Sequence, residues 1–122
     1  MLLQESGQMY LETILVLSKT MPTVRAIDIV EHMGYSKPSV SRAMGLLKNG
    51  GFIQVNEDGH ISLTPTGREV AETIFDRHNV LTRALVLLGV DDDTASEDAC
   101  KIEHAISDRS IEAIKKYLNS LA

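Results

Sequence analysis

The 122-residue chain has one cysteine, no tryptophan and few other aromatic side chains, which together make up 4% of the residues. A single cysteine excludes an intramolecular disulfide. So few rings argue against a pocket walled by aromatic side chains, and we expect no organic small-molecule ligand. The sequence also lacks an apolar run of about 18 residues and a charged-then-apolar leader. We therefore expect a cytoplasmic protein with no membrane partner.

The apolar content, 43% of residues, is enough for one compact unit or for two small units with a continuous core. The net charge of −5 is uneven: residues 1–70 carry six Lys/Arg and seven Asp/Glu, whereas residues 71–122 carry six and ten. No acidic residue lies between Glu31 and Glu57. Because salt screens charges beyond about 8–10 Å, this acid-free segment can follow DNA phosphates even on an acidic protein.

Helical periodicity and turn signals predict an N-terminal winged helix-turn-helix. We expect helices over 5–18 and 26–33, and a third helix that begins after the turn at Gly34-Tyr35 with Ser36 as its N-cap. Two helices joined by a tight glycine-containing turn are typical of a helix-turn-helix. Alternating residues over 52–63, with a turn at Asp58-Gly59, predict the hairpin that forms the wing.

The rest of the chain is predicted to be helical, which makes the whole protein mainly α with a small β-hairpin. We expect a long helix over 65–88, a solvated turn at the acidic run 91–93, and a T-x-x-E capping box at Thr94 and Glu97 that starts the next helix. A last helix is predicted after Ser107. The expected domains are a winged helix-turn-helix over 1–70 and a helical metal-binding and dimerisation domain over 71–122.

One short segment carries metal-binding chemistry. Cys100, Glu103 and His104 are spaced i, i+3, i+4, which would place a thiol, a carboxylate and an imidazole on one helix face. These donors suit a first-row transition metal better than calcium or magnesium. Alternatively, a free cysteine is often a buried small hydrophobe. A Cys–His nucleophile pair is a further possibility, but no oxyanion-hole glycine segment or third orienting group accompanies it, so we expect no enzyme.

Several segments together resemble the diphtheria-toxin-repressor family of metal-dependent regulators, which has iron-responsive and manganese-responsive branches. The segments are Gln8 to Ile14 (QMYLETI), Ser36 to Ser41 (SKPSVS), Leu63 to Arg68 (LTPTGR), His78, and Asp98 to Asp108 (DACKIEHAISD). They span nearly the whole chain. The resemblance implies a winged helix-turn-helix followed by a helical dimerisation domain, a divalent metal cofactor, and a homodimer on double-stranded operator DNA.

The resemblance implies a principal metal site formed by Met9, Cys100, Glu103 and His104. Any second ion should involve Glu12 and His78, because Thr82 and Ser96 replace two ligands of the iron-responsive members. Met9 and Cys100 are similar to the iron-type pattern, whereas Glu12 is similar to the manganese-type pattern. The implied cofactor is therefore Fe(II) or Mn(II), while the Irving–Williams order allows zinc, cobalt or nickel to bind in vitro.

The third predicted helix is the expected DNA-reading element. The predicted DNA contacts are Arg25, Lys37, Pro38, Ser39, Ser41, Arg42 and Lys48. Arg42 is the main candidate for base reading, because its guanidinium can contact guanine O6 and N7 together. It stands where the family's pattern predicts a shorter polar residue. Arg25 and Lys48 are expected to contact phosphates, although Lys37 and Lys48 could instead be merely solvated.

Apolar residues of the C-terminal half exceed what a small helical pair can bury, which predicts a homodimer on a pseudo-palindromic operator. They are Val80, Leu81, Ala84, Leu85, Leu87, Leu88, Ile111, Ile114 and Leu118. The alternative is an intrachain core. The predicted function is metal-dependent transcriptional repression. The alternative function is a winged-helix module for protein interaction, or for constitutive DNA binding without a metal switch.

Overall fold

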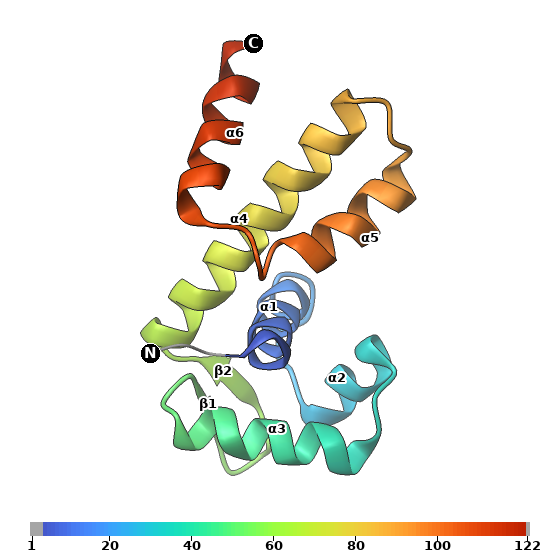
Figure 1. The fold of residues 1–122 in the computed structure, drawn as a ribbon. Coiled ribbons are helices and arrows are strands. Elements are labelled where there is room, and N and C mark those ends of the chain that lie inside the picture. The colour runs from blue at the N-terminus through green and yellow to red at the C-terminus, as the bar shows by residue number, and fades with distance from the viewer. Residues whose placement is uncertain (1–3, 122) are drawn as a thin grey trace. The chain divides into compact units, whose positions relative to one another are not determined.

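The computed structural model describes residues 4–121, which form six helices and one two-stranded antiparallel sheet (Figure 1). The chain divides into two compact units, one up to Glu72 and one from Thr73. The prediction of a mainly α chain with a small β-hairpin is confirmed. Among residues 4–121, no helix combines the length and the apolar character needed to cross a membrane.

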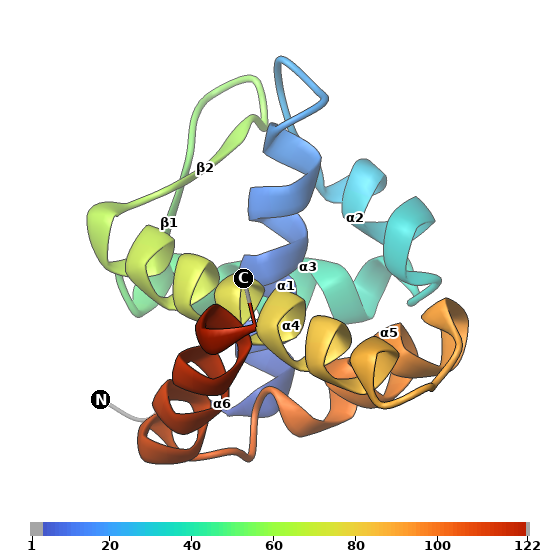
Figure 2. The same cartoon turned by 90° about the horizontal axis from the view of Figure 1, so that it is seen from above.

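The first unit is a three-helix core with a hairpin. Its elements are α1 (Glu5–Ser18), α2 (Ala26–Met33), α3 (Lys37–Asn49), β1 (Ile53–Val55) and β2 (Ile61–Leu63). The two strands pair with Gln54 opposite Ser62. Ile61 also donates its backbone N–H to the carbonyl of Val24, at 2.7 Å, which ties the hairpin to the segment before α2. Figure 2 shows the hairpin beside α1, against which β2 packs.

Local signals explain the bounds of α2 and α3. Gly34 adopts φ 74°, a left-handed conformation that glycine accepts without strain, and its N–H bonds to the carbonyl of Val30. The Ser36 hydroxyl then accepts the Ser39 N–H at 3.3 Å as the N-cap of α3. The expected helix-turn-helix geometry therefore follows from a glycine stop and a serine start.

The start of α4 (Pro65–Leu87) is packed unusually closely against the residue that precedes the wing. Thr64 donates its N–H to the carbonyl of Phe52 at 3.1 Å, and its hydroxyl accepts the N–H of Gly67 at 3.1 Å. A Cβ at position 67 would lie 1.9 Å from the Phe52 carbonyl oxygen. Only glycine fits there.

The second unit contains most of α4, then α5 (Asp92–Ile102) and α6 (Asp108–Ser120). Leu81, Ala99 and Ile111, one from each helix, form its buried core. Leu118 is buried as well. Part of the apolar set expected at a dimer interface therefore fills the interior of this unit, and Leu87 and Leu88 stay exposed.

The predicted capping box at Thr94 and Glu97 is wrong. The helix starts earlier, at Asp92, because the Asp91 carboxylate accepts the N–H of Thr94 at 3.0 Å and acts as the N-cap. The same hydrogen bond holds the pKa of Asp91 below its ordinary value. The acidic run 91–93 is therefore a helix start, where negative charge is favourable, and not a solvated turn.

Candidate metal centre

The end of α5 differs from the expected continuous helix. The helix ends at Ile102, Glu103 is its C-cap, and His104 lies in the turn that follows. Glu103 still donates its N–H to the carbonyl of Ala99 at 2.9 Å and so keeps the helical course. The prediction that Cys100, Glu103 and His104 share one helix is therefore wrong, since only Cys100 lies within α5.

The centre of the site is the carboxylate of Glu103, whose side chain is 0% exposed. Nδ1 of His78, on α4, lies 2.8 Å from one carboxylate oxygen, Oε2. Nε2 of His104 lies 3.3 Å from the other, Oε1, and the His104 side chain is only 3% exposed. A buried carboxylate is costly without polar partners, and here imidazole nitrogens flank both of its oxygens.

The two polar residues that the resemblance placed at ligand positions of iron-responsive members also contact His78. The Ser96 hydroxyl lies 3.3 Å from Nε2 of His78. Thr82 instead donates its hydroxyl to the backbone carbonyl of His78, at 2.7 Å. Thr82 therefore contacts the backbone of His78, whereas Ser96 contacts its imidazole.

The remaining predicted ligands belong to two different units. Cys100 is half-buried on α5, one helical turn before Glu103. Met9 and Glu12 lie on α1 of the first unit, three residues apart and both half-buried. The second unit by itself therefore brings together His78, Glu103 and His104, with Cys100 on the helix that leads to them.

The donor set fits a divalent first-row transition metal. Imidazole nitrogen and carboxylate oxygen suit iron, manganese and zinc, and a thiolate favours the softer of these ions. Calcium and magnesium prefer oxygen-only shells, which two histidines do not provide. The chemistry of the buried cluster therefore matches the cofactor class predicted from the sequence.

The predicted DNA-contacting residues of α3 are all exposed. Val40, Met44 and Leu47 are the buried residues of this helix. The exposed predicted residues of this helix are Lys37, Pro38, Ser39, Ser41, Arg42 and Lys48. The hydroxyl of Ser39 accepts a hydrogen bond from the Ser36 hydroxyl at 2.8 Å, so its own proton remains available to an acceptor.

Three further exposed residues share a face of α3 with Arg42. Gly45, Leu46 and Asn49 follow Arg42 at i+3, i+4 and i+7, a spacing that places them on the same helix face. Leu46 is 68% exposed although it is a large apolar residue. Their spacing from Arg42 is visible in the sequence and identifies them as neighbours of this residue on the helix.

Arg25 lies at the junction of α2 and the wing. Its backbone N–H donates to the Asp28 carboxylate at 2.8 Å. Its guanidinium Nη2 lies 3.1 Å from Nε2 of His60 in the hairpin. The guanidinium is therefore exposed beside the wing, where a phosphate contact is sterically accessible.

Comparison with known proteins gives matches along almost the whole chain. The family model described as iron dependent repressor, N-terminal DNA binding domain, matches residues 2–61. The model described as iron dependent repressor, metal binding and dimerisation domain, matches residues 64–122. Together they cover the helix-turn-helix, the wing except residues 62–63, and the buried histidine–carboxylate cluster.

Individual proteins agree with the family models. The chain is 30% identical over 121 residues to the diphtheria toxin repressor of Corynebacterium diphtheriae, covering 98% of this chain and 54% of that protein. It is 31% identical over 118 residues to a helix-turn-helix transcriptional regulator of Methanocaldococcus jannaschii, covering 95% and 94%. A solved manganese-dependent transcriptional repressor in complex with manganese superposes with a TM-score of 0.85 at 30% identity, covering 93% of this chain and 52% of that one.

This chain spans about half the length of the diphtheria toxin repressor and of that manganese-dependent repressor, but nearly the full length of the M. jannaschii regulator. The family models and these relatives agree on one assignment: the chain belongs to the diphtheria-toxin-repressor family of metal-dependent transcriptional regulators.

Proposed function

We propose that this protein is a transcriptional repressor that binds operator DNA as a homodimer when Fe(II) or Mn(II) is bound. The buried Glu103 carboxylate between His78 and His104 carries the proposal, because it provides transition-metal ligands in a chain that also contains a helix-turn-helix. Residues 1–70 would bind DNA, and residues 71–122 would bind the metal and dimerise. Such a regulator acts in the cytoplasm, where its operator lies.

The proposed metal ligands come from three helices and one turn. We propose a principal site formed by Met9 on α1, Cys100 on α5, and Glu103 and His104 just after α5. We propose that any second ion binds Glu12 on α1 and His78 on α4. A bound divalent ion would supply positive charge to the buried carboxylate and cross-link separate segments of the chain. The hydrogen bond between His78 and Glu103 holds these two side chains close together before an ion binds.

The proposed DNA contacts lie on the exposed side of α3 and beside the wing. The acid-free stretch between Glu31 and Glu57 supports this assignment, since no carboxylate on that stretch would repel phosphate. Arg42 would read a base edge, Pro38, Ser39 and Ser41 would contact bases or the backbone, and the basic residues would bind phosphates. The phosphate contacts are assigned to Arg25, Lys37 and Lys48.

An apolar groove of about 540 Å³ in the second unit supports the proposed homodimer. It is lined by Leu81, Ala84, Leu85, Leu87, Leu88, Ile102, Ala113, Ile114, Tyr117, Leu118 and Leu121. The description of the matching family model as a dimerisation domain also favours a second copy of the chain in this groove. Sedimentation at micromolar concentration should report a dimer, and a monomer would contradict the proposal.

The test is anaerobic fluorescence anisotropy with the DNA upstream of the protein's own gene, at fixed salt. Titrations with chelator, iron(II), manganese(II) and zinc(II) are compared with titrations of unrelated DNA. We expect an active ion to tighten specific binding at least about tenfold, equivalent to about 1.4 kcal/mol. Tight binding in chelator, or no specific binding with any ion, would reject the metal switch.

Arg42→Ala should weaken binding selectively at one base pair of the operator. Loss of a bidentate contact to guanine costs about 1–3 kcal/mol and relaxes discrimination at that position. Affinities are measured for a set of duplexes that each change one base pair. Lys48→Ala is the matched control, expected to weaken binding equally on every duplex and to lower the salt slope by about one. The same uniform loss for Arg42→Ala would reassign this residue to phosphate binding.

A further inference from the structure

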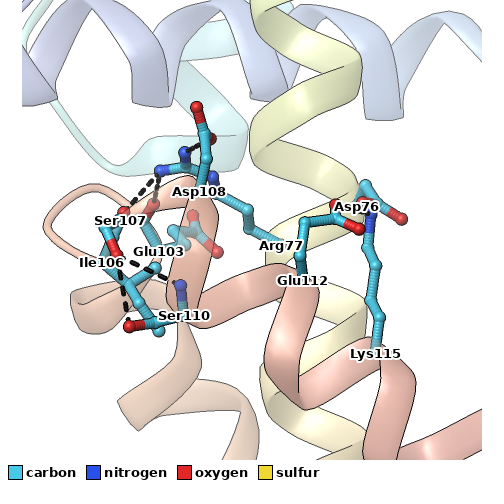
Figure 3. Close-up of polar contacts among 9 residues, drawn as sticks. All are labelled: Asp76, Arg77, Glu103, Ile106, Ser107, Asp108, Ser110, Glu112 and Lys115. Atoms are coloured by element: carbon cyan, nitrogen blue, oxygen red, sulfur yellow. Dashed lines mark hydrogen bonds and ion pairs between the residues drawn. The ribbon is translucent and has the colours of Figure 1, made fainter.

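Arg77, the residue before His78 on α4, is the centre of a network that no sequence signal singled out. Its Nη1 donates to two backbone carbonyls, those of Glu103 at 3.1 Å and of Ile106 at 2.9 Å. Its Nη2 pairs with the carboxylate of Asp108. Figure 3 shows the guanidinium extending from α4 to the turn between α5 and α6. The Arg77 side chain is only 14% exposed.

The turn that Arg77 contacts carries two of the proposed metal ligands. The carbonyls at a helix C-terminus have no intrahelical partner and need donors from elsewhere. Arg77 supplies donors to the carbonyls of Glu103 and Ile106, which lie on either side of His104. Because a guanidinium holds its N–H groups in a rigid planar fork, the spacing of these carbonyls is constrained.

The residue after Arg77 on α4 contacts the side chain of Glu103. His78 follows Arg77 directly on α4, and its Nδ1 lies 2.8 Å from the Glu103 carboxylate. Adjacent residues of one helix therefore contact both the side chain of Glu103 and its backbone carbonyl. Holding the backbone of a ligand keeps its side chain in one orientation, and such supporting groups strongly affect metal affinity.

We infer that Arg77 is a positioning residue of the metal centre, which fixes the turn bearing Glu103 and His104 relative to His78. This inference rests on the proposed function. Arg77 itself contacts carbonyl oxygens and the Asp108 carboxylate, and it offers no lone pair to a metal ion.

A neighbouring ion pair provides a matched control. Lys115 on α6 contacts Asp76 on α4, with Nζ 2.6 Å from the carboxylate, and this hydrogen bond raises the pKa of Lys115. The pair joins α4 to α6 as the Arg77–Asp108 pair does, and it lies one residue earlier on α4. Lys115 contacts the carboxylates of Asp76 and Glu112, whereas Arg77 contacts the carbonyls of the turn after α5.

The experiment measures binding of manganese(II) and cobalt(II) to the 122-residue chain by calorimetry and by cobalt(II) visible absorption. We expect Arg77→Met to bind both ions about 10–100-fold more weakly than wild type, with an altered cobalt(II) spectrum. Lys115→Met should bind within about twofold of wild type even where it lowers thermal stability. Asp108→Asn, which retains the two carbonyl bonds, should resemble wild type in metal affinity.

Arg77→Lys provides a second variant should Arg77→Met fail to fold. It keeps the positive charge but loses the planar guanidinium, so its metal affinity is expected to lie between those of wild type and Arg77→Met. Wild-type affinity in a folded Arg77→Met or Arg77→Lys, or an equal loss of affinity in Lys115→Met, would overturn the positioning role. If wild type binds manganese(II) and cobalt(II) and the variants give these contradicting results, the positioning role of Arg77 fails but the proposed function does not. If wild type binds neither ion, the proposed function fails with it.

Discussion

Cys100→Ala and His104→Ala are each expected to abolish metal-stimulated DNA binding while the chain stays folded. Each variant removes one proposed donor: His104 lies beside the buried Glu103 carboxylate, and Cys100 lies one helical turn before it. An ion shifts a two-state equilibrium only by its preference for one state over the other, and removal of a donor weakens that preference. Anisotropy with the active ion should therefore give the same affinity as anisotropy with chelator.

Glu97→Ala is the matched control for these variants. Glu97 is an exposed carboxylate on the same helix, and Asp91 rather than a capping box starts that helix. Its removal should leave both metal stimulation and the far-ultraviolet circular dichroism unchanged. If Cys100→Ala and His104→Ala both titrate with metal as wild type does, the assigned ligands are incorrect.

Gly67→Ala is expected to destabilise the first unit severely. The added Cβ would lie 1.9 Å from the carbonyl oxygen and 2.9 Å from the carbonyl carbon of Phe52. Both are backbone atoms, so no side-chain rotation relieves the clash, and the Thr64–Phe52 hydrogen bond at the start of α4 must break. Urea unfolding should show the free energy of unfolding reduced by about 3 kcal/mol or more, the upper end of the cost of overpacking.

Gly45→Ala provides the opposite expectation within the same unit. Gly45 lies within α3, and apart from its chain neighbours and the backbone of its own helix no described atom comes within 4 Å of a Cβ built there. Alanine in an exposed helix interior is more favourable than glycine by about 0.5–1 kcal/mol, so this variant should gain stability. If Gly67→Ala unfolds at the same urea concentration as Gly45→Ala, the close approach to Phe52 has no energetic consequence.

The helices of the first unit were predictable because their ends are marked by unambiguous residues. Gly34 stops α2 and Ser36 caps α3, and Pro38 in the first turn favours a start at Ser36 over one at Ser39. The start of α5 was not predictable in this way, because Asp91 and Thr94 are both good N-caps and lie three residues apart. Asp91 is used, with Thr94 contributing its N–H rather than its hydroxyl. Pattern alone does not decide between two overlapping caps.

The metal centre was only partly predictable. The spacing of Cys100, Glu103 and His104 indicated metal chemistry, but their common helix was assumed, and the helix in fact ends at Ile102. Placing His78 beside them required the family resemblance. Arg77 gave no signal, because the carbonyls that it contacts lie 26 and 29 residues later in the sequence. Such long-range contacts to backbone atoms leave no residue-type pattern to recognise.

The contact between Arg77 and the Ile106 carbonyl has a consequence for how a cell would set its response to metal. Ile106 lies two residues before α6, and α6 contributes to the apolar groove proposed to receive a second copy. If the ligand turn and this groove are coupled through one guanidinium, the coupling is reciprocal, so self-association strengthens ion capture by the factor with which the ion strengthens self-association. The metal concentration at which genes are silenced would then fall as the cell makes more regulator, and protein abundance would itself tune the sensor.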